Sequence, residues 1–387
     1  MKHDWKYIKL GDIISPAKVV RNGANKKFPV LSITMRDGIV LQSSRFKKSI
    51  ASVDTSDYKV VYNGQLVIAF PIDEGLIYTQ DIVDAGIMSP AYNVWNVDFL
   101  EIDRKFLVLY LHCPFSMAYY KSKLRGTTMR RRSMPKEDLL NMPLPVPSFS
   151  VQQSIVSELD KINELIRLKK EQLKDYDNLA QSIFYEMFGD PVVNEKGWEK
   201  KRLGEVCSEI KYGTSKPACD NGKYKYLRMC NLSYDGYLDL TDIKRIDVSD
   251  EEIEKCIVRY GDILFNRTNS QELIGKTCMF DQQEPMVIAG YIIRVRLTKE
   301  LMPQVFARMF NLASIKKLLR SMAKGAVNQA NINSKELASI QIPIPSLDLQ
   351  QHFVKRIELI EQQKAEIQST IADLETLLAS RMQYWFD

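Results

Sequence analysis

The sequence predicts a mixed α/β fold, built as two tandem globular domains that are each followed by a long helix. One observation is an internal duplication, in which LLNMPLPVPSFSVQQ (Leu139–Gln153) returns 198 residues later as LASIQIPIPSLDLQQ (Leu337–Gln351). A second is that a long run without Gly or Pro follows each copy of this segment. A duplication of this length indicates one architectural unit used twice. The predicted boundaries are 1–147 and 191–345 for the domains, and 148–190 and 346–387 for the helices.

Each domain begins with a related segment, WKYIKLGDI at Trp5–Ile13 and WEKKRLGEV at Trp198–Val206. Short runs rich in β-forming residues follow and are bounded by Gly, Pro, Asn and Asp, which is typical of strands in a mixed fold. Helical patterns come next, at Lys105–Leu124 in the first domain and at Pro303–Met322 in the second. The predicted strands are Lys59–Val61, Gln65–Phe70, Tyr92–Val97, Asp262–Asn266 and Met286–Leu297.

A basic loop without carboxylates follows the helical pattern of each domain. The segment Lys121–Lys136 holds seven Lys and Arg residues, and Lys316–Lys335 holds five together with Asn and Gln. Arg can bind guanine through two hydrogen bonds, and Asn or Gln can bind adenine in the same way. A solvated basic loop without a ligand is the alternative for either segment alone. Their matching places in the repeat favour contacts with DNA, where Gly126 and Gly325 permit close approach of the backbone.

The candidate DNA-binding residues lie in these two loops and in polar segments near them. The list for the first domain is Arg36, Arg45, Lys121, Lys123, Arg125, Gly126, Thr127, Thr128, Arg130, Arg131 and Arg132. The list for the second domain is Arg228, Asn231, Arg267, Asn269, Ser270, Lys324, Gly325, Asn328, Gln329 and Asn331.

The two terminal runs of each repeat predict long helices, Ser148–Phe188 and Ser346–Asp387. Each follows a Pro-x-Pro element that cannot continue into a helix from upstream. Ser150 with Gln153, and Asp348 with Gln351, have the spacing of an N-cap and its third helical residue. Gly189 supplies a stop for the first helix.

Apolar residues in these helices recur at steps of four and three, which is typical of a coiled-coil seam. Because the repeats should be related by a pseudo-two-fold axis, we expect the helices to pair as an antiparallel coiled coil within the chain. Pairing with other chains is the alternative. Lys169, Lys364 and Arg381 interrupt the seams and can fix their register. The predicted seam residues are Ile155, Leu159, Ile162, Ile166 and Leu173 in the first helix, and Phe353, Ile357, Ile360, Ile367, Ile371, Leu374 and Leu378 in the second.

Charge differs between the domains and the helices. Residues 1–147 carry 21 Lys and Arg against 14 Asp and Glu, and residues 194–345 carry 24 against 19. Residues 148–193 carry 5 against 8, and residues 346–387 carry 4 against 7. Basic domains suit a polyanion, because Lys and Arg that neutralise phosphates release condensed counterions. The acidic helices are therefore expected to serve protein contacts.

The sequence carries no recognisable catalytic or metal-binding motif. It has six cysteines without C-x-x-C spacing and three histidines, so free, mostly buried thiols are expected rather than a zinc site. No phosphate-binding loop of the G-x-x-x-x-G-K-[ST] type is present. The amino-terminal segment lacks the apolar run of a signal peptide, and no segment is apolar over the length of a membrane span. A cytoplasmic location is expected.

The order of the duplicated segments resembles the DNA-specificity (S) subunits of type I restriction–modification systems, and the resemblance spans the whole chain. One departure is that Arg130–Arg132 stands where the second loop keeps Asn and Gln residues. The segments that carry the resemblance are LGDI (Leu10–Ile13), LGEV (Leu203–Val206), GIMSPAY (Gly86–Tyr92), GDILFNR (Gly261–Arg267), IGKT (Ile274–Thr277) and the two Pro-x-Pro to Gln-Gln segments.

The resemblance implies a subunit that is not itself an enzyme. It implies one target-recognition domain on each half of a bipartite, asymmetric site in double-stranded DNA, with the helix pair as a ruler for the unread spacer. Two modification subunits would dock on the helices and methylate adenine with S-adenosylmethionine, and restriction subunits would add ATP- and Mg-dependent translocation and cleavage. No cofactor is expected in this chain.

Two other classes of function remain open. The chain could be a coiled-coil adaptor, outside restriction, whose basic domains bind nucleic acid. It could also be a stand-alone methyltransferase or nuclease with unusual motifs. Salt-sensitive, sequence-selective binding to duplex DNA separates a specificity subunit from the adaptor, and binding of S-adenosylmethionine by the isolated chain would favour the enzyme.

Overall fold

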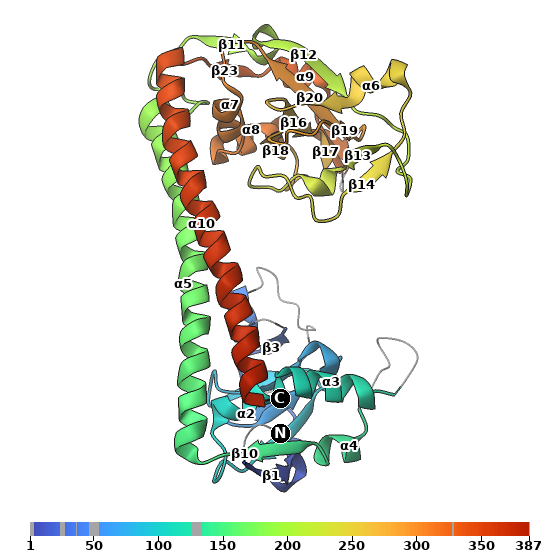
Figure 1. Ribbon diagram of the computed structural model, residues 1–387, viewed down its shortest axis with the longest axis vertical. Helices are drawn as coiled ribbons and strands as arrows, with labels where there is room; N and C mark the ends of the chain where they lie inside the picture. The colour runs from blue at the N-terminus through green and yellow to red at the C-terminus, as the bar shows by residue number, and fades with distance from the viewer. Residues whose placement is uncertain are drawn as a thin grey trace. The chain divides into compact units, whose positions relative to one another are not determined.

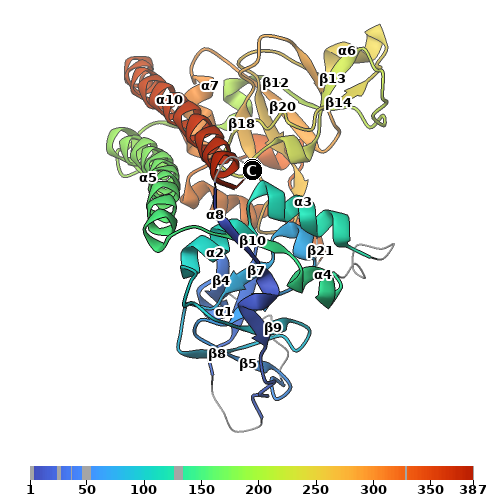
Figure 2. The same ribbon diagram turned by 60° about the horizontal axis from the view of Figure 1, so that its bottom comes forward.

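The computed structural model contains two compact units (Figures 1 and 2). One unit is formed by Met1–Lys170 with Ser369–Asp387, and the other by Glu171–Gln368. The two long helices thus contribute to both units, a division that cuts across the domain boundaries expected from sequence. The structure describes residues 4–23, 28–35, 37–45, 54–125, 134–326 and 329–386.

The first unit is built around a four-stranded antiparallel sheet with the order β2-β9-β6-β7. Three two-stranded antiparallel pairs, β1-β10, β3-β4 and β5-β8, accompany it. The strands are β1 (Lys6–Lys9), β2 (Ile14–Pro16), β3 (Leu31–Thr34), β4 (Gly38–Leu41), β5 (Lys59–Tyr62), β6 (Leu66–Ile68), β7 (Ile77–Thr79), β8 (Ala85–Met88), β9 (Asn93–Val97) and β10 (Pro143–Val146). The short helices are α1 (Gln42–Arg45), α2 (Arg104–Leu111), α3 (Pro114–Lys123) and α4 (Lys136–Leu140).

The second unit contains a matching antiparallel sheet with the order β12-β20-β16-β18. A mixed sheet (β14-β13-β19-β15), a small sheet (β17-β22-β21) and the pair β11-β23 complete its strands. The strands are β11 (Lys200–Arg202), β12 (Cys207–Tyr212), β13 (Tyr224–Leu227), β14 (Lys244–Ile246), β15 (Ile257–Val258), β16 (Ile263–Asn266), β17 (Thr268–Asn269), β18 (Thr277–Met279), β19 (Met286–Ile288), β20 (Ile292–Leu297), β21 (Lys324–Ala326), β22 (Gln329–Asn331) and β23 (Gln341–Pro343). The helices are α6 (Asp250–Cys256), α7 (Pro303–Phe310), α8 (Ala313–Met322) and α9 (Ser334–Ala338).

The duplicated Leu-Gly segments have the same structural role in both units. Leu10 and Leu203 are fully buried, each in a 3-10 turn. The Leu10 N–H donates to the Met142 carbonyl, and the Leu203 N–H donates to the Ile340 carbonyl, each at 2.8 Å. A Cβ at the following Gly11 would lie 2.9 Å from the Leu140 side chain, so a side chain does not fit there without a shift. In the first unit, Leu10 and Gly11 therefore hold the end of the short helix α4 against the first strands.

A buried glutamine holds the Pro-x-Pro element of each repeat. Gln350 is fully buried, its side-chain amide donates to the carbonyls of Pro345 and Glu300 (2.9 Å each), and its Oε1 accepts from the Met302 N–H (2.8 Å). Gln152 makes the same three kinds of contact, with the carbonyls of Pro147 and Glu101 and with the Asp103 N–H. This glutamine ties the start of the long helix to the segment before α2 in the first unit and to the segment before α7 in the second.

The long helices are α5 (Phe149–Phe188) and α10 (Leu347–Phe386), each of 40 residues. They lie side by side in the views of Figures 1 and 2. The Arg381 side chain pairs with Glu158, and Lys170 with Glu375. Lys364 pairs with Asp177. The residue numbers of the partners therefore rise along α5 while they fall along α10. The helices therefore pack antiparallel, as the sequence predicts.

The predicted seam residues are buried or partly buried. Nine of them are at most 8% exposed: Ile155, Leu159, Ile162, Ile166, Phe353, Ile357, Ile360, Ile367 and Ile371. Leu173, Leu374 and Leu378 are partly buried. Lys364, which interrupts the apolar repeat, is only 5% exposed and donates to Asp177 Oδ1 (2.5 Å) and to the Tyr237 hydroxyl (2.6 Å). Since a buried ammonium group needs such partners, this site favours a single register.

Three expectations about local structure are wrong. The long helices begin at Phe149 and Leu347, so Ser150 and Asp348 lie inside them and are not N-caps. The helical pattern Lys105–Leu124 is two helices, because Pro114 starts α3 and cannot continue α2; Pro303–Met322 is likewise divided into α7 and α8. The predicted strand Met286–Leu297 is two strands separated at Gly290.

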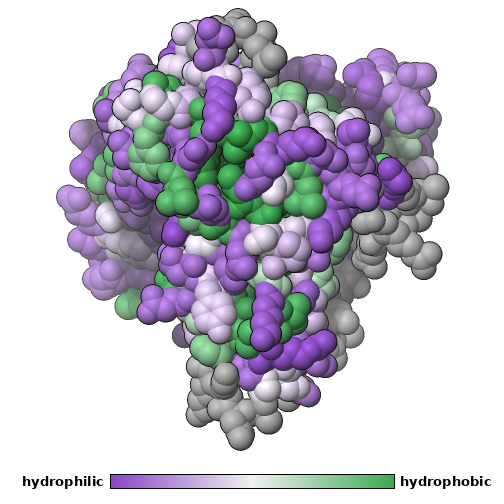
Figure 3. Space-filling model, turned by 90° about the horizontal axis from the view of Figure 1, so that it is seen from below, coloured by the Kyte–Doolittle hydropathy of each residue, from purple (hydrophilic) through white to green (hydrophobic). Residues whose placement is uncertain are grey.

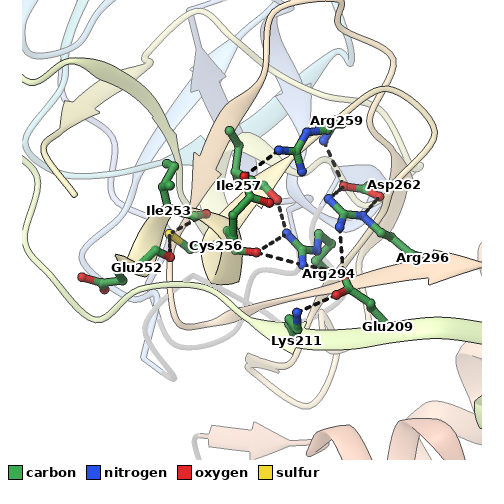
Figure 4. A network of polar contacts seen from close by, with 11 residues as sticks. Glu209, Lys211, Glu252, Ile253, Cys256, Ile257, Arg259, Asp262, Arg294 and Arg296 are labelled. Atoms are coloured by element: carbon green, nitrogen blue, oxygen red, sulfur yellow. Dashed lines mark hydrogen bonds and ion pairs between the residues drawn. The ribbon is translucent and has the colours of Figure 1, made fainter. Parts of the chain in front are cut away.

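A network of charged residues joins two sheets of the second unit (Figure 4). Arg294, on β20, is fully buried and donates to the Ile257 carbonyl on β15 and to Glu209 Oε2 (2.8 Å) on β12. Arg296 donates to the same Glu209 oxygen (2.7 Å) and to Asp262 Oδ1 (2.8 Å). The guanidinium of Arg294 thus links the β12-β20-β16-β18 sheet to the mixed sheet.

Candidate nucleic-acid interface

In the second basic segment, Lys316–Met322 lies in α8 rather than in a loop, and the residues that follow form a β-hairpin in the second unit. Strands β21 and β22 pair antiparallel, with Gly325 opposite Ala330, and β22 also pairs with β17. Strand β17 comes one residue after β16, which is a buried strand of the main sheet. The pairing of β22 with β17 therefore joins the hairpin to the main sheet. This arrangement brings the predicted residues near 267–270 together with those of the hairpin.

Arg267 stands where β16 passes into β17, at the base of the hairpin. Its Nε donates to Asn331 Oδ1 (3.2 Å), and its guanidinium carbon lies 4.9 Å from the centroid of the Tyr212 ring. The Tyr212 hydroxyl in turn accepts from the Ser334 N–H (2.8 Å) and donates to Ser334 Oγ (3.0 Å). Both supports of Arg267 are therefore themselves held in place. Sequence reasoning missed Tyr212, because only the tertiary structure brings it under the guanidinium.

The neighbouring predicted residues differ in how their polar groups are used. Asn331 Oδ1 accepts from Thr268 Oγ1 (3.3 Å) as well as from Arg267. Asn269 is partly buried and its Oδ1 accepts from the Ser270 N–H (2.8 Å), whereas Ser270 is exposed. Lys324 and Gly325 lie in β21 and Gln329 in β22, for which the backbone is described. Asn328 lies outside the described residues.

Arg228 and Asn231 contact other parts of their own segment. Arg228 Nη2 donates to Asp242 Oδ2 (2.7 Å) and to the Asp242 carbonyl (2.8 Å), and the hydrogen bond to the Asp242 carboxylate raises the pKa of Arg228. Asn231 is 2% exposed, and its side-chain amide donates to the Asp239 carbonyl (2.8 Å). These contacts hold the segment from Arg228 to Asp242 together, and Asn231 has little surface left to offer a ligand.

One lysine of the second basic segment is buried. Lys316 belongs to α8, is 3% exposed, and its ammonium group donates to the Gly275 carbonyl (2.7 Å). Burial lowers the pKa of Lys316 to about 7. This residue therefore holds the Ile274–Thr277 segment against α8, and its burial keeps it from contacting a ligand at the hairpin.

The first basic loop is described only at its two ends. Lys121 is exposed at the end of α3, whereas Lys123 and Arg125 lie 3.5 Å and 3.6 Å from the Asp138 carboxylate oxygens. The Lys136 ammonium lies 5.5 Å from the centroid of the Trp95 ring. Figure 3 shows the face seen from below, on which hydrophilic and apolar residues are interspersed. The predicted residues that lie outside the described ranges are Gly126, Thr127, Thr128, Arg130, Arg131 and Arg132.

The two remaining candidates of the first unit are Arg36 and Arg45. Arg36 lies outside the described residues, and Arg45 is the last residue of α1 with only its backbone described. The structure therefore leaves both as predictions from sequence.

All six cysteines are free; Cys113, Cys256 and Cys278 are buried, whereas Cys219 and Cys230 are exposed. Within the described residues, no three His, Cys, Asp or Glu side chains gather in a way that could hold a metal ion. In the same part of the chain, no helix combines the length and apolar character needed to cross a membrane.

Comparison with known proteins finds the same family for both halves of the chain. The family model described as "Type I restriction modification DNA specificity domain" matches residues 2–175 and again residues 195–375. The chain is 23% identical over 384 residues to the type I restriction enzyme MjaVIII specificity subunit of Methanocaldococcus jannaschii, covering 92% of this chain and 86% of that protein.

Two further similarities were found. The putative type I restriction enzyme MjaX specificity subunit of Methanocaldococcus jannaschii is 30% identical over 162 residues, which cover 41% of this chain. The alignment spans only 38% of the length of that relative. A chain from a structural study of complex assembly and conformational transition of the type I R-M system superposes with a TM-score of 0.59 at 20% identity, covering 99% of this chain and 97% of the other. At this identity the superposition shows the fold alone.

The two family matches cover most of the sequence, and each includes one basic loop with the sheet and short helices that carry it. The chain therefore belongs to the family of type I restriction modification DNA specificity proteins.

Proposed function

We propose that this protein is the sequence-specific DNA-binding subunit of a type I restriction–modification complex, and that each unit reads one half of a bipartite, asymmetric site. The observation that carries the proposal is the repeated plan with unlike loops. Two units place a basic segment after equivalent short helices, α3 and α8, yet the residues of the two segments differ. Because the two basic segments differ in sequence although the units share one fold, we expect them to recognise two different half-sites.

We further propose that the chain acts with two methyltransferase subunits and with restriction subunits, in the cytoplasm. S-adenosylmethionine, ATP and Mg would be bound by those partners. The long helices suit protein docking better than DNA contact, because residues 148–193 and 346–387 both carry more acidic than basic residues. Base methylation requires the target adenine to leave the stack, and we assign the receiving pocket to the methyltransferase.

The proposed function is tested by measuring binding and turnover with the purified full chain. We expect affinity for duplex DNA to fall steeply as salt rises, because each neutralised phosphate contributes about 0.9 to the slope of log affinity against log salt. With ATP, magnesium and S-adenosylmethionine present, we expect neither cleavage nor methylation of that DNA. Equal affinity for RNA would favour the adaptor, and turnover by the chain alone would favour the stand-alone enzyme.

A further inference from the structure

The guanidinium of Arg267 is held at its Nε, whereas its two terminal nitrogens remain available as donors. Asn331 holds its Nε and the Tyr212 ring supports its face. Within the described residues, the two terminal nitrogens have no hydrogen-bond or ion-pair partner. Arg267 is partly buried, so its side chain is confined while those two donors remain available. A planar, prepositioned fork of this kind matches an acceptor pair on a planar ligand.

Three other arginines of the second unit form ion pairs instead. Arg228 pairs with Asp242, Arg259 with Glu254, and Arg296 with Glu209 and Asp262. Each of these guanidinium groups is neutralised by a carboxylate, which weakens its attraction for a polyanion. Arg267 instead receives neutral support from an amide oxygen and an aromatic ring, so its full positive charge is retained at this point of the unit.

The position of Arg267 is the base of a two-stranded ribbon. The Arg267 carbonyl accepts from the Ile332 N–H (2.9 Å), which anchors the residue to the end of β22. Strand β17, directly after Arg267, is the third strand of the same small sheet. The major groove of DNA is wide enough to admit a two-stranded ribbon, and a side chain at the edge of such a ribbon can reach the base edges.

We propose that Arg267 reads a guanine in the half-site of the second unit, through its two terminal nitrogens and the O6 and N7 atoms of the base. Asn331 is then a positioning residue that holds the Arg267 Nε, rather than a reader of adenine. Tyr212 has the same supporting role on the face of the guanidinium. This inference rests on the proposed function, because it names one base contact within the DNA site that the second unit would bind.

A contact with a base explains the geometry better than a contact with a phosphate. A phosphate is attracted by charge over a range of side-chain positions, and a flexible lysine serves it equally well. Two supports that fix the plane and the rotation of the guanidinium are useful when the acceptors are two atoms in one plane. The pair of contacts from Asn331 and Tyr212 therefore favours guanine.

The test compares full-length Arg267→Ala and Arg267→Lys with the unaltered chain. The probe is a set of duplexes that carry every base at each position of the site selected by the unaltered chain. We expect both variants to lose preference for guanine at one position by about 5- to 150-fold, while the other half-site keeps its preferences. Arg267→Lys keeps the charge, so we expect its salt slope to stay close to that of the unaltered chain.

Two further variants separate positioning from folding. Asn331→Ala removes the acceptor for Nε and should weaken the same guanine preference by a smaller factor, without creating a preference for another base. Arg259→Ala is the matched control, because its exposed side chain pairs with Glu254 in the same unit. It should leave every base preference unchanged. Thermal unfolding of each variant reports whether the second unit remains folded.

Three results would overturn the inference. A uniform loss of affinity for all sequences, with the salt slope of Arg267→Ala reduced by about one, would identify a phosphate contact. Unchanged base preferences together with unchanged affinity in Arg267→Ala would mean that the residue contacts no DNA. Loss of an adenine preference in Asn331→Ala would make Asn331 the reader. If the unaltered chain selects no sequence at all, the proposed function fails before this inference is reached.

Discussion

Replacing Arg294 by alanine should destabilise the second unit by about 2–5 kcal/mol, the usual cost of truncating a large, fully buried side chain. The side chain is fully buried and donates to Glu209 and to the Ile257 carbonyl, so its loss leaves acceptors on two sheets without this donor. Hydrogen exchange at the amides of β12 and β15, measured together with chemical unfolding, reports the effect in this unit alone.

The matched control for this prediction is Arg259→Ala. Arg259 also pairs with a carboxylate of the second unit, but both side chains are largely exposed, at 44% and 65%. Exposed pairs contribute about 0–1 kcal/mol, so this variant should unfold close to the unaltered chain. Equal stability of the two variants would show that the network in Figure 4 does not hold the two sheets together.

Replacing Arg130, Arg131 and Arg132 together by alanine should flatten the salt dependence of DNA binding by up to about three units of slope, about one for each phosphate that is no longer neutralised. If one of them also reads a base, the half-site of the first unit should lose roughly 1–3 kcal/mol of discrimination for each pair of hydrogen bonds removed. Competition binding over a range of salt concentrations, on duplexes altered in one half-site at a time, measures both quantities.

A triple variant of equal charge change controls for net charge. Lys6, Arg21 and Lys105 are exposed residues of the first unit that pair with Glu101, Asp57 and Asp160. Because these charges are already balanced locally, their replacement by alanine should change the slope much less than replacement of the arginine triplet. The loop assignment is contradicted if both triple variants behave alike, or if the arginine triplet affects the two half-sites equally.

The sequence predicts the repeated plan and the long helices because these depend on signals spread over many residues. The four-and-three spacing from Ile155 to Ile166 predicts that these side chains are buried, and the structure confirms that they are. The spacing of Ser150 and Gln153 suggests the wrong N-cap, because a pattern of two residues is a weak, local signal. The neighbouring Gln152 instead binds the Glu101 carbonyl, a partner 51 residues away that no local pattern reveals.

The sequence predicts a location for the candidate site, but it does not predict how the residues there contact one another. The basic loop before Lys335 and the segment after Gly261 are visible in the sequence, and the structure brings them together in the β17-β22-β21 sheet. That Asn331 is turned toward Arg267, and that Asn231 is buried against the Asp239 carbonyl, depends on tertiary contacts. Composition indicates which side chains can bind a base, but it does not indicate which of them already form hydrogen bonds within the protein.

Selection from a pool of random duplex DNA by the full chain, at near-physiological salt, tests most directly whether each unit reads one half-site. We expect an enriched pattern of two specified blocks of unlike sequence, separated by a spacer of fixed length whose bases are unspecified. A pool without an enriched pattern, or one enriched in a single continuous block, would contradict the reading of one half-site by each unit.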